Sequence, residues 1–176
     1  MSLSANLSQP NNCDVRKFTW SLINCRSVKN KLTDLHYLLN TGSTDILVLT
    51  ETWLDVSIPN SIVAPNGIYR VFRHDRASAG GGVAILVKDC ILTKLVTIDS
   101  VFDHLEIVAV DLKFGDTQYR VASFYSLPGI NIDDLKYLSD AVKCFQMLSS
   151  THHVTVILGD FGSFTVVQKH QSILFC

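Results

Sequence analysis

The sequence lacks several features that mark other classes of protein. No apolar run is long enough to cross a membrane, because the longest, such as residues 83–87, are strand-sized and a spanning helix needs about 20 apolar residues. The first twelve residues contain no basic stretch followed by an apolar core, so we expect no signal peptide. Sixteen acidic residues against 15 Lys and Arg give a net charge of −1, which argues against nucleic-acid binding through overall charge.

Cysteine pairs at metal-binding spacing and a phosphate-binding loop are also missing. The five cysteines are odd in number and widely separated, which favours reduced thiols in an intracellular protein over a disulfide framework or a zinc site. The glycine triplet at 80–82 lacks the Lys and Ser or Thr that follow in a P-loop, and it leads into a predicted strand. It therefore indicates a close approach of the backbone to a neighbouring element.

What is present fits one globular domain. The chain has 176 residues, of which 47% are hydrophobic and 18% charged, a balance that excludes a disordered protein. A domain of this size buries roughly two thirds of its unfolded surface. Residues 1–16 are polar and aperiodic, and we expect them to form a loose tail.

Hydrophobic periodicity predicts an α/β fold of about seven strands and two helices. Helices are expected at 28–40, with Gly42 as the C-cap, and at 133–149. The apolar face of the second helix is expected to consist of Leu135, Leu138, Val142, Phe145 and Leu148. The segment 55–67 is expected to be loop. Strands are expected at 18–23, 45–50, 69–74, 83–88, 104–113, 118–125 and 154–158. Because several strands separate the helices, we expect sheets with helices packed outside them.

Polar residues end several of the predicted strands. Asn24, Glu51 and Asp160 follow three of them, and Tyr125 ends a fourth. If those strands lie side by side, these side chains converge at one edge. Two carboxylates and an amide oxygen are hard ligands suited to Mg²⁺ or Mn²⁺, and a phenol can hydrogen-bond a phosphate oxygen. The alternative is that the acids only cap strand ends or face solvent.

The order of short motifs is more specific than the spacing of single residues. Along the chain stand Asn24-Cys-Arg-Ser, Leu47-Val-Leu-Thr-Glu-Thr-Trp-Leu, Phe72-Arg-His-Asp-Arg with Gly80-Gly-Gly-Val-Ala-Ile-Leu, Ser123-Phe-Tyr-Ser-Leu-Pro and Ile157-Leu-Gly-Asp-Phe. Over residues 18–161 this set resembles the endonuclease/exonuclease/phosphatase (DNase I-like) superfamily, and most closely the endonuclease of LINE-type (non-LTR) retrotransposons. The resemblance implies a four-layer α/β sandwich spanning about 17–161.

The resemblance also implies roles for the four strand-end residues. Glu51 would bind the metal, Asn24 would assist the metal or the scissile phosphate, Tyr125 would support the phosphate, and Asp160 would orient or deprotonate the attacking water. The reaction would be Mg²⁺-dependent (or Mn²⁺-dependent) nicking of double-stranded DNA, which exposes a 3′-hydroxyl that primes reverse transcription. A protein acting on chromosomal DNA would work in the nucleus.

Three arginines are further candidates for the substrate site. Arg26, Arg73 and Arg76 lie in or beside these motifs and could contact backbone phosphates. The alternative is that they form ion pairs or simply lie on the surface.

The sequence departs from the superfamily pattern at its C-terminal end. Gly162 stands where the pattern has Asn, and the loss of one such donor costs about 3 kcal/mol in the barrier. The family's closing Ser-Asp-His motif has no counterpart, and 162–176 forms an atypical tail, so we expect a truncated domain of weak or absent activity. The alternatives are an inactive remnant that binds a partner or itself through open sheet edges, and a phosphatase of the same superfamily.

Overall fold

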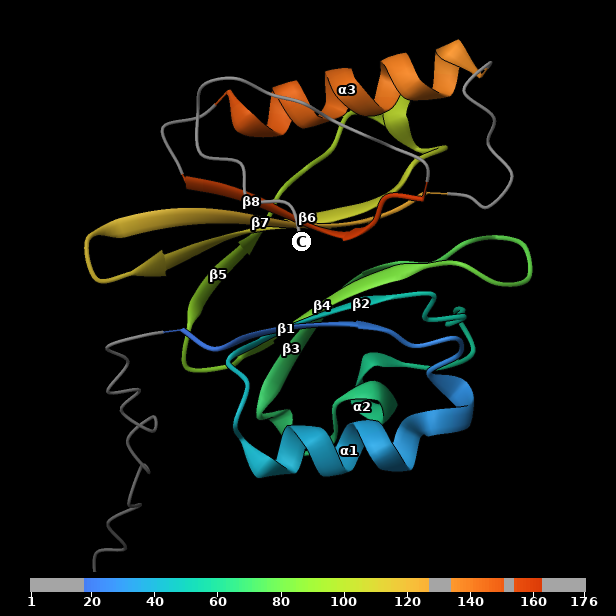
Figure 1. Ribbon diagram of the computed structural model, residues 1–176. Helices are drawn as coiled ribbons and strands as arrows, with labels where there is room; N and C mark the ends of the chain where they lie inside the picture. Colours follow the sequence, from blue (N-terminus) through green and yellow to red (C-terminus); the bar gives the residue numbers. More distant parts are fainter. Residues whose placement is uncertain (1–17, 127–133, 151–153, 163–176) are drawn as a thin grey trace, which may run out of the picture.

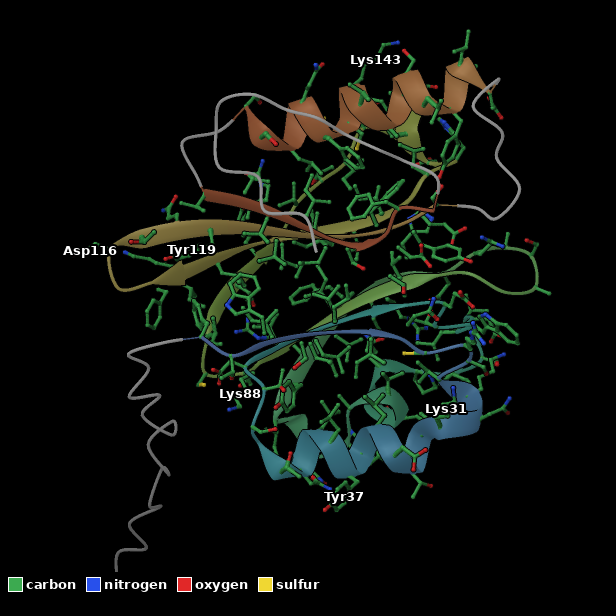
Figure 2. All side chains as sticks on the ribbon, viewed as in Figure 1. Lys31, Tyr37, Lys88, Asp116, Tyr119 and Lys143 are labelled. Atoms are coloured by element: carbon green, nitrogen blue, oxygen red, sulfur yellow. The ribbon has the colours of Figure 1, made fainter. Side chains whose placement is uncertain are left out.

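Two four-stranded sheets face each other in the computed structural model, which describes residues 18–126, 134–150 and 154–162 (Figure 1). Helices cover the outer face of each sheet, so the protein has the four layers expected from its sequence. Figure 2 shows side chains filling the space between the layers. None of the helices in these ranges is long and apolar enough to cross a bilayer.

The first sheet has the strand order β1-β2-β4-β3. Its strands are β1 (Trp20–Asn24), β2 (Ile46–Thr50), β3 (Tyr69–His74) and β4 (Val83–Lys88). β1 and β2 run parallel, and the other pairs are antiparallel. Every residue of β2 is buried, because Leu47 and Leu49 pack toward the outer helices while Ile46 and Val48 pack against the second sheet. The continuous apolar run of β2 therefore reflects burial on both faces.

The second sheet has the order β5-β6-β7-β8. Its strands are β5 (Leu92–Leu95), β6 (Glu106–Phe114), β7 (Thr117–Tyr125) and β8 (Val154–Asp160). β7 and β8 are parallel, and the hairpin predicted between β6 and β7 is present. Alternate residues of β7 face opposite layers: Val121 and Tyr125 pack between the sheets, whereas Ala122 and Phe124 pack toward the outer helix. This sheet has edge strands at β5 and β8.

Three α-helices and three short 3₁₀ segments complete the described chain. They are η1 (Lys29–Lys31), α1 (Leu32–Thr41), α2 (Asn60–Val63), η2 (Pro65–Gly67), η3 (Ser100–Phe102) and α3 (Leu135–Ser149). Gly42 ends α1 in the left-handed conformation with φ +63°, as predicted for a C-cap. The apolar face predicted for α3 is confirmed at Phe145 and Leu148, which are buried. It is wrong at Leu135 and Val142, which are 73% and 39% exposed, because Tyr137, Ala141 and Cys144 complete the buried stripe.

The cysteines differ from one another in their chemistry. Cys25 and Cys144 are buried free thiols, as expected. Cys90, just after β4, is disulfide-bonded, so the prediction of five reduced thiols is wrong at that residue. Cys13 and Cys176 lie outside the described residues.

Burial of the two free thiols makes stability fall at alkaline pH. Burial raises the pKa of each thiol from 9.0 to about 11, so the folded chain keeps protons that the unfolded chain has already lost. The stabilisation is full below pH 9 and disappears as the pH rises from 9 to 11, at roughly 2 kcal/mol per thiol. We expect Cys144→Ala to flatten the decline of the unfolding free energy over that interval, measured by urea unfolding at pH 8, 9 and 10. An unchanged slope would contradict the assignment.

Candidate active site

The four polar residues predicted at strand ends do lie at one end of the sandwich. Asn24 ends β1, Glu51 follows β2, Tyr125 ends β7 and Asp160 ends β8. The parallel register places Tyr125 opposite Asp160 in the second sheet. The edge strands β1 and β8 contact each other across the sandwich. Both strands end on the right in Figure 1. The site is thus built from both sheets.

One amide joins the two carboxylates. The Asn24 Nδ2 group donates to Glu51 Oε1 at 2.7 Å and to Asp160 Oδ2 at 3.3 Å. The backbone N–H of Arg26 donates to Asn24 Oδ1 at 3.2 Å, which turns the amide nitrogen toward the carboxylates. Two acids separated by 109 positions in the chain therefore share one hydrogen-bond donor.

The two carboxylates fit a divalent cation. Neither Glu51 nor Asp160 forms an ion pair with a Lys, Arg or His within 18–126, 134–150 and 154–162. The same ranges contain no cluster of three or more His, Cys, Asp or Glu that could hold a metal. A site with two carboxylates suits Mg²⁺, which keeps several waters and takes further oxygens from a substrate phosphate. Asn24 presents a nitrogen here, so it would bind a metal only after its amide turned over.

Unusual backbone geometry surrounds Glu51. Positive φ angles occur at Arg26 (+42°), Ser27 (+84°), Glu51 (+51°) and Trp53 (+52°), a conformation that costs non-glycine residues on the order of 1–2 kcal/mol each. Hydrogen bonds hold the two loops together, because the N–H of Ser27 donates to Glu51 O at 2.9 Å. These hydrogen bonds maintain the strained conformation, and they hold the backbone of Glu51 in place.

The glycine triplet supports the same loop. The N–H groups of Thr52 and Trp53 donate to the carbonyls of Gly82 and Gly81, at 3.2 and 2.9 Å. A Cβ at Gly81 would overlap the Arg76 guanidinium and a Glu106 carboxylate oxygen. The sequence-based interpretation of this triplet as a close backbone approach is therefore correct.

Tyr125 stays protonated at the site. Burial, with the nearby carboxylates of Glu51, Asp160 and Glu106, raises the pKa of Tyr125 to about 12, against an opposing effect of Arg76. The Arg76 guanidinium lies 5.8 Å from the centre of the tyrosine ring. At neutral pH the phenol is therefore a hydrogen-bond donor.

Comparison with known proteins decides the family. A model of the endonuclease/exonuclease/phosphatase family matches residues 22–163. The chain belongs to this family. No curated protein sequence matches the chain.

Solved structures of the DNase I-like superfamily share the fold. An AP endonuclease from Archaeoglobus fulgidus is 20% identical with a TM-score of 0.62, over 82% of this chain and 57% of that one. A Neisseria 3′ phosphatase, solved with a product DNA hairpin, is 20% identical with a TM-score of 0.60 over 81% and 56%. The endonuclease domain of TRAS1, a telomere-specific non-LTR retrotransposon, is 16% identical with a TM-score of 0.56 over 78% and 58%. The chain spans between 56% and 58% of the length of these structures.

Two of the three arginines predicted to contact the substrate form ion pairs and hydrogen bonds within the protein instead. Arg76 forms an ion pair with the buried Glu106, in which its Nε (2.6 Å) and Nη2 both donate to Oε1. Arg73 donates to the carbonyls of Ile58 (2.7 Å) and Asp55 (3.2 Å) and pairs with Asp75. Arg73 and Arg76 therefore form ion pairs within the protein, which was the alternative to contacting DNA phosphates. The Arg26 side chain is exposed and has no ion pair with any residue of the described chain.

Glu106 was not predicted as part of this region. It is 4% exposed, and it also accepts a hydrogen bond from the Gly82 N–H. The chain has only two glutamates, Glu51 and Glu106, and both lie at this end of the sandwich. No periodicity could have paired Glu106 with Arg76, because 30 positions separate them.

We expect Arg76→Ala to destabilise the protein by about 3 kcal/mol, because it leaves the buried Glu106 carboxylate without its partner. Lys143→Ala is the matched control: this lysine extends outward from α3 in Figure 2, its side chain is 62% exposed, and its contact with Asp140 is long, at 3.6 Å. Its loss should change stability by less than about 0.5 kcal/mol. Equal urea midpoints for the two variants would show that the Arg76 pair is not a structural element.

Proposed function

We propose that this chain carries the metal-binding part of a phosphodiester hydrolase that acts on DNA and uses Mg²⁺ or Mn²⁺. The proposal depends mainly on one observation: the Asn24 amide joins Glu51 and Asp160. Within the described residues, no Lys, Arg or His forms an ion pair with either carboxylate. The DNA hairpin in the Neisseria structure supports DNA as the substrate. The motif pattern and the likeness to the TRAS1 domain support a retrotransposon origin.

Each side chain has a role that follows from its position. Glu51 and Asp160 would hold the cation, which when bound neutralises charge on the scissile phosphate and lowers the pKa of a bound water. The Tyr125 phenol donates a hydrogen bond to a phosphate oxygen. Asp160 has one oxygen fixed by the Gly162 N–H at 3.0 Å, and it orients the attacking water and accepts its proton. Asn24 keeps the two carboxylates together.

The proposed cut leaves a 3′-hydroxyl. The water oxygen bonds to phosphorus and gives its proton to Asp160, while the bond from phosphorus to the 3′ oxygen breaks and that oxygen takes up a proton from bulk water. The cut strand then ends in a 3′-hydroxyl, the group that a reverse transcriptase extends. We propose that this chain produces such a nick in double-stranded DNA.

A second candidate function is DNA binding without hydrolysis. Gly162 favours it, because a backbone N–H contacts Asp160 where the superfamily pattern predicts an Asn side chain. A glycine offers no side-chain donor to the phosphate or the water, and the loss of one donor lowers the rate on the order of 10²-fold. Under this alternative the site would still bind a cation and DNA.

Nicking of supercoiled plasmid tests the proposal. We expect the chain to convert supercoiled DNA to open circles slowly with Mg²⁺ or Mn²⁺, at the weak activity that Gly162 predicts, and the reaction to stop when EDTA is added. Asp160→Asn should abolish the reaction, whereas Asp116→Asn should not. Asp116 lies in the β6–β7 turn at the opposite end of the sandwich (Figure 2), so it controls for the loss of one acid. DNA binding without metal-dependent nicks would favour the second candidate.

A further inference from the structure

A cavity of about 460 Å³ opens beside the candidate active site. Three loops form it: Ser27–Asn30 after β1, Trp53–Asp55 after β2, and Arg76–Gly80 between β3 and β4. These loops gather at the same end of the sandwich as Asn24 and Glu51 (Figure 1). Arg76 connects the two regions, since it lines the cavity and also lies over the Tyr125 ring. The volume is that of a small-ligand site.

Trp53 is the unusual residue in this cavity. Its side chain is 42% exposed, although Thr52 and Leu54 on either side are 0% and 2% exposed. Its backbone has φ +52°, and its N–H is held by the Gly81 carbonyl at 2.9 Å. A bulky residue in this conformation is strained, and packing gains nothing from a large exposed indole. A strained and exposed aromatic residue next to a reactive site indicates a binding role.

The charges of the cavity wall cancel one another. Lys29 pairs with Asp55, and Arg76 pairs with Glu106. The lining residues therefore offer no unpaired lysine or arginine to a phosphate group. An uncharged, flat ligand with hydrogen-bonding edges suits an indole surface beside the polar side chains of Ser27, Asn30 and Ser78.

We propose that this cavity is a subsite for a nucleobase that stacks on Trp53. The proposal rests on the proposed function, because the base belongs to a nucleotide beside the phosphate that a cation at Glu51 and Asp160 would contact. Only Thr52 stands between Glu51 and Trp53, so their Cα atoms are at most about 7 Å apart and the two groups would contact neighbouring parts of one DNA strand. Trp53 is thus a substrate-positioning residue, and stacking of this kind strengthens binding roughly 5- to 150-fold.

The subsite is tested with a fluorescein-labelled, eight-nucleotide single-stranded DNA. Its binding is measured by fluorescence anisotropy in EDTA, so that hydrolysis cannot interfere. We expect Trp53→Ala to weaken binding at least about 10-fold and Trp53→Phe, which keeps an aromatic face, to weaken it less than about 3-fold. Tyr37→Ala is the matched control, because Tyr37 is an exposed aromatic on α1, 75% accessible and away from the cavity. An oligonucleotide of the same length with abasic nucleotides should bind wild type and Trp53→Ala equally.

The outcomes separate the subsite from the proposed function. Equal affinity of wild type and Trp53→Ala, with metal-dependent nicking intact, would overturn the subsite alone. Wild-type protein that neither binds the oligonucleotide nor nicks plasmid would overturn both. A Trp53→Ala defect of the same size on the abasic oligonucleotide would also overturn the subsite, because the contact would then be to the backbone. Asp160→Asn should lose nicking activity. Trp53→Ala should still weaken oligonucleotide binding when it is introduced into the Asp160→Asn variant.

Discussion

Glu51→Gln should lower the rate of metal-dependent plasmid nicking by at least about 100-fold. Glutamine keeps the size of the side chain and an oxygen that can accept from Asn24 Nδ2, so the hydrogen bond of 2.7 Å has a replacement. What the variant loses is the negative charge that would hold the cation. The expected defect is therefore chemical, with the thermal unfolding midpoint close to that of wild type.

Rates are measured as open-circle formation at saturating Mg²⁺ and again at saturating Mn²⁺. Asp116→Asn serves as the control because it removes one acid from the far turn without touching the site. If Glu51→Gln nicked DNA as fast as the control, Glu51 would have no part in the reaction. If Glu51→Gln were unfolded, Asp160→Asn would supply the same test.

Gly159→Ala should strongly destabilise β8, the strand that ends in Asp160. A Cβ at Gly159 would overlap the Phe124 carbonyl oxygen and lie 2.7 Å from its carbonyl carbon. These are backbone atoms of the paired strand β7, so no side chain can move aside to make room. We expect a loss of more than about 3 kcal/mol and a fall of about 10 °C in the unfolding midpoint.

Gly115→Ala separates the steric clash from the effect of backbone conformation. Gly115 also has a positive φ, +56°, but a Cβ there would meet nothing within 4 Å. Its replacement should cost only about 1 kcal/mol. Similar unfolding midpoints for the two variants would mean that β8 can move away from β7, and that Asp160 is not held in place by Gly159.

The elements that were predicted correctly are those whose burial or termini follow local sequence patterns. The continuous apolar run of β2 and the glycine after α1 each reflect a local rule, so both were found from sequence. β5 was missed because it is a short edge strand whose Leu92 and Leu95 are 69% and 53% exposed, so it has no buried face to create an alternation. α2 was missed because its four residues lie in a segment rich in Pro and Asn.

The site was predictable as a set of residues but not as a geometry. Strand ends in parallel pairs meet at one edge, which is why Asn24, Glu51 and Asp160 were grouped correctly. The direction of the Asn24 amide depends on the Arg26 backbone, and the role of Arg76 depends on Glu106 across the sandwich. Contacts of this kind arise only from tertiary packing, and no sequence period encodes them.

Titration with Mn²⁺, followed by the electron paramagnetic resonance signal of the free ion, tests the central claim that Glu51 and Asp160 form a divalent-cation site. We predict binding by wild type and by Asp116→Asn, and at least about 10-fold weaker binding by Glu51→Gln and Asp160→Asn. Identical binding curves for all four proteins would contradict it.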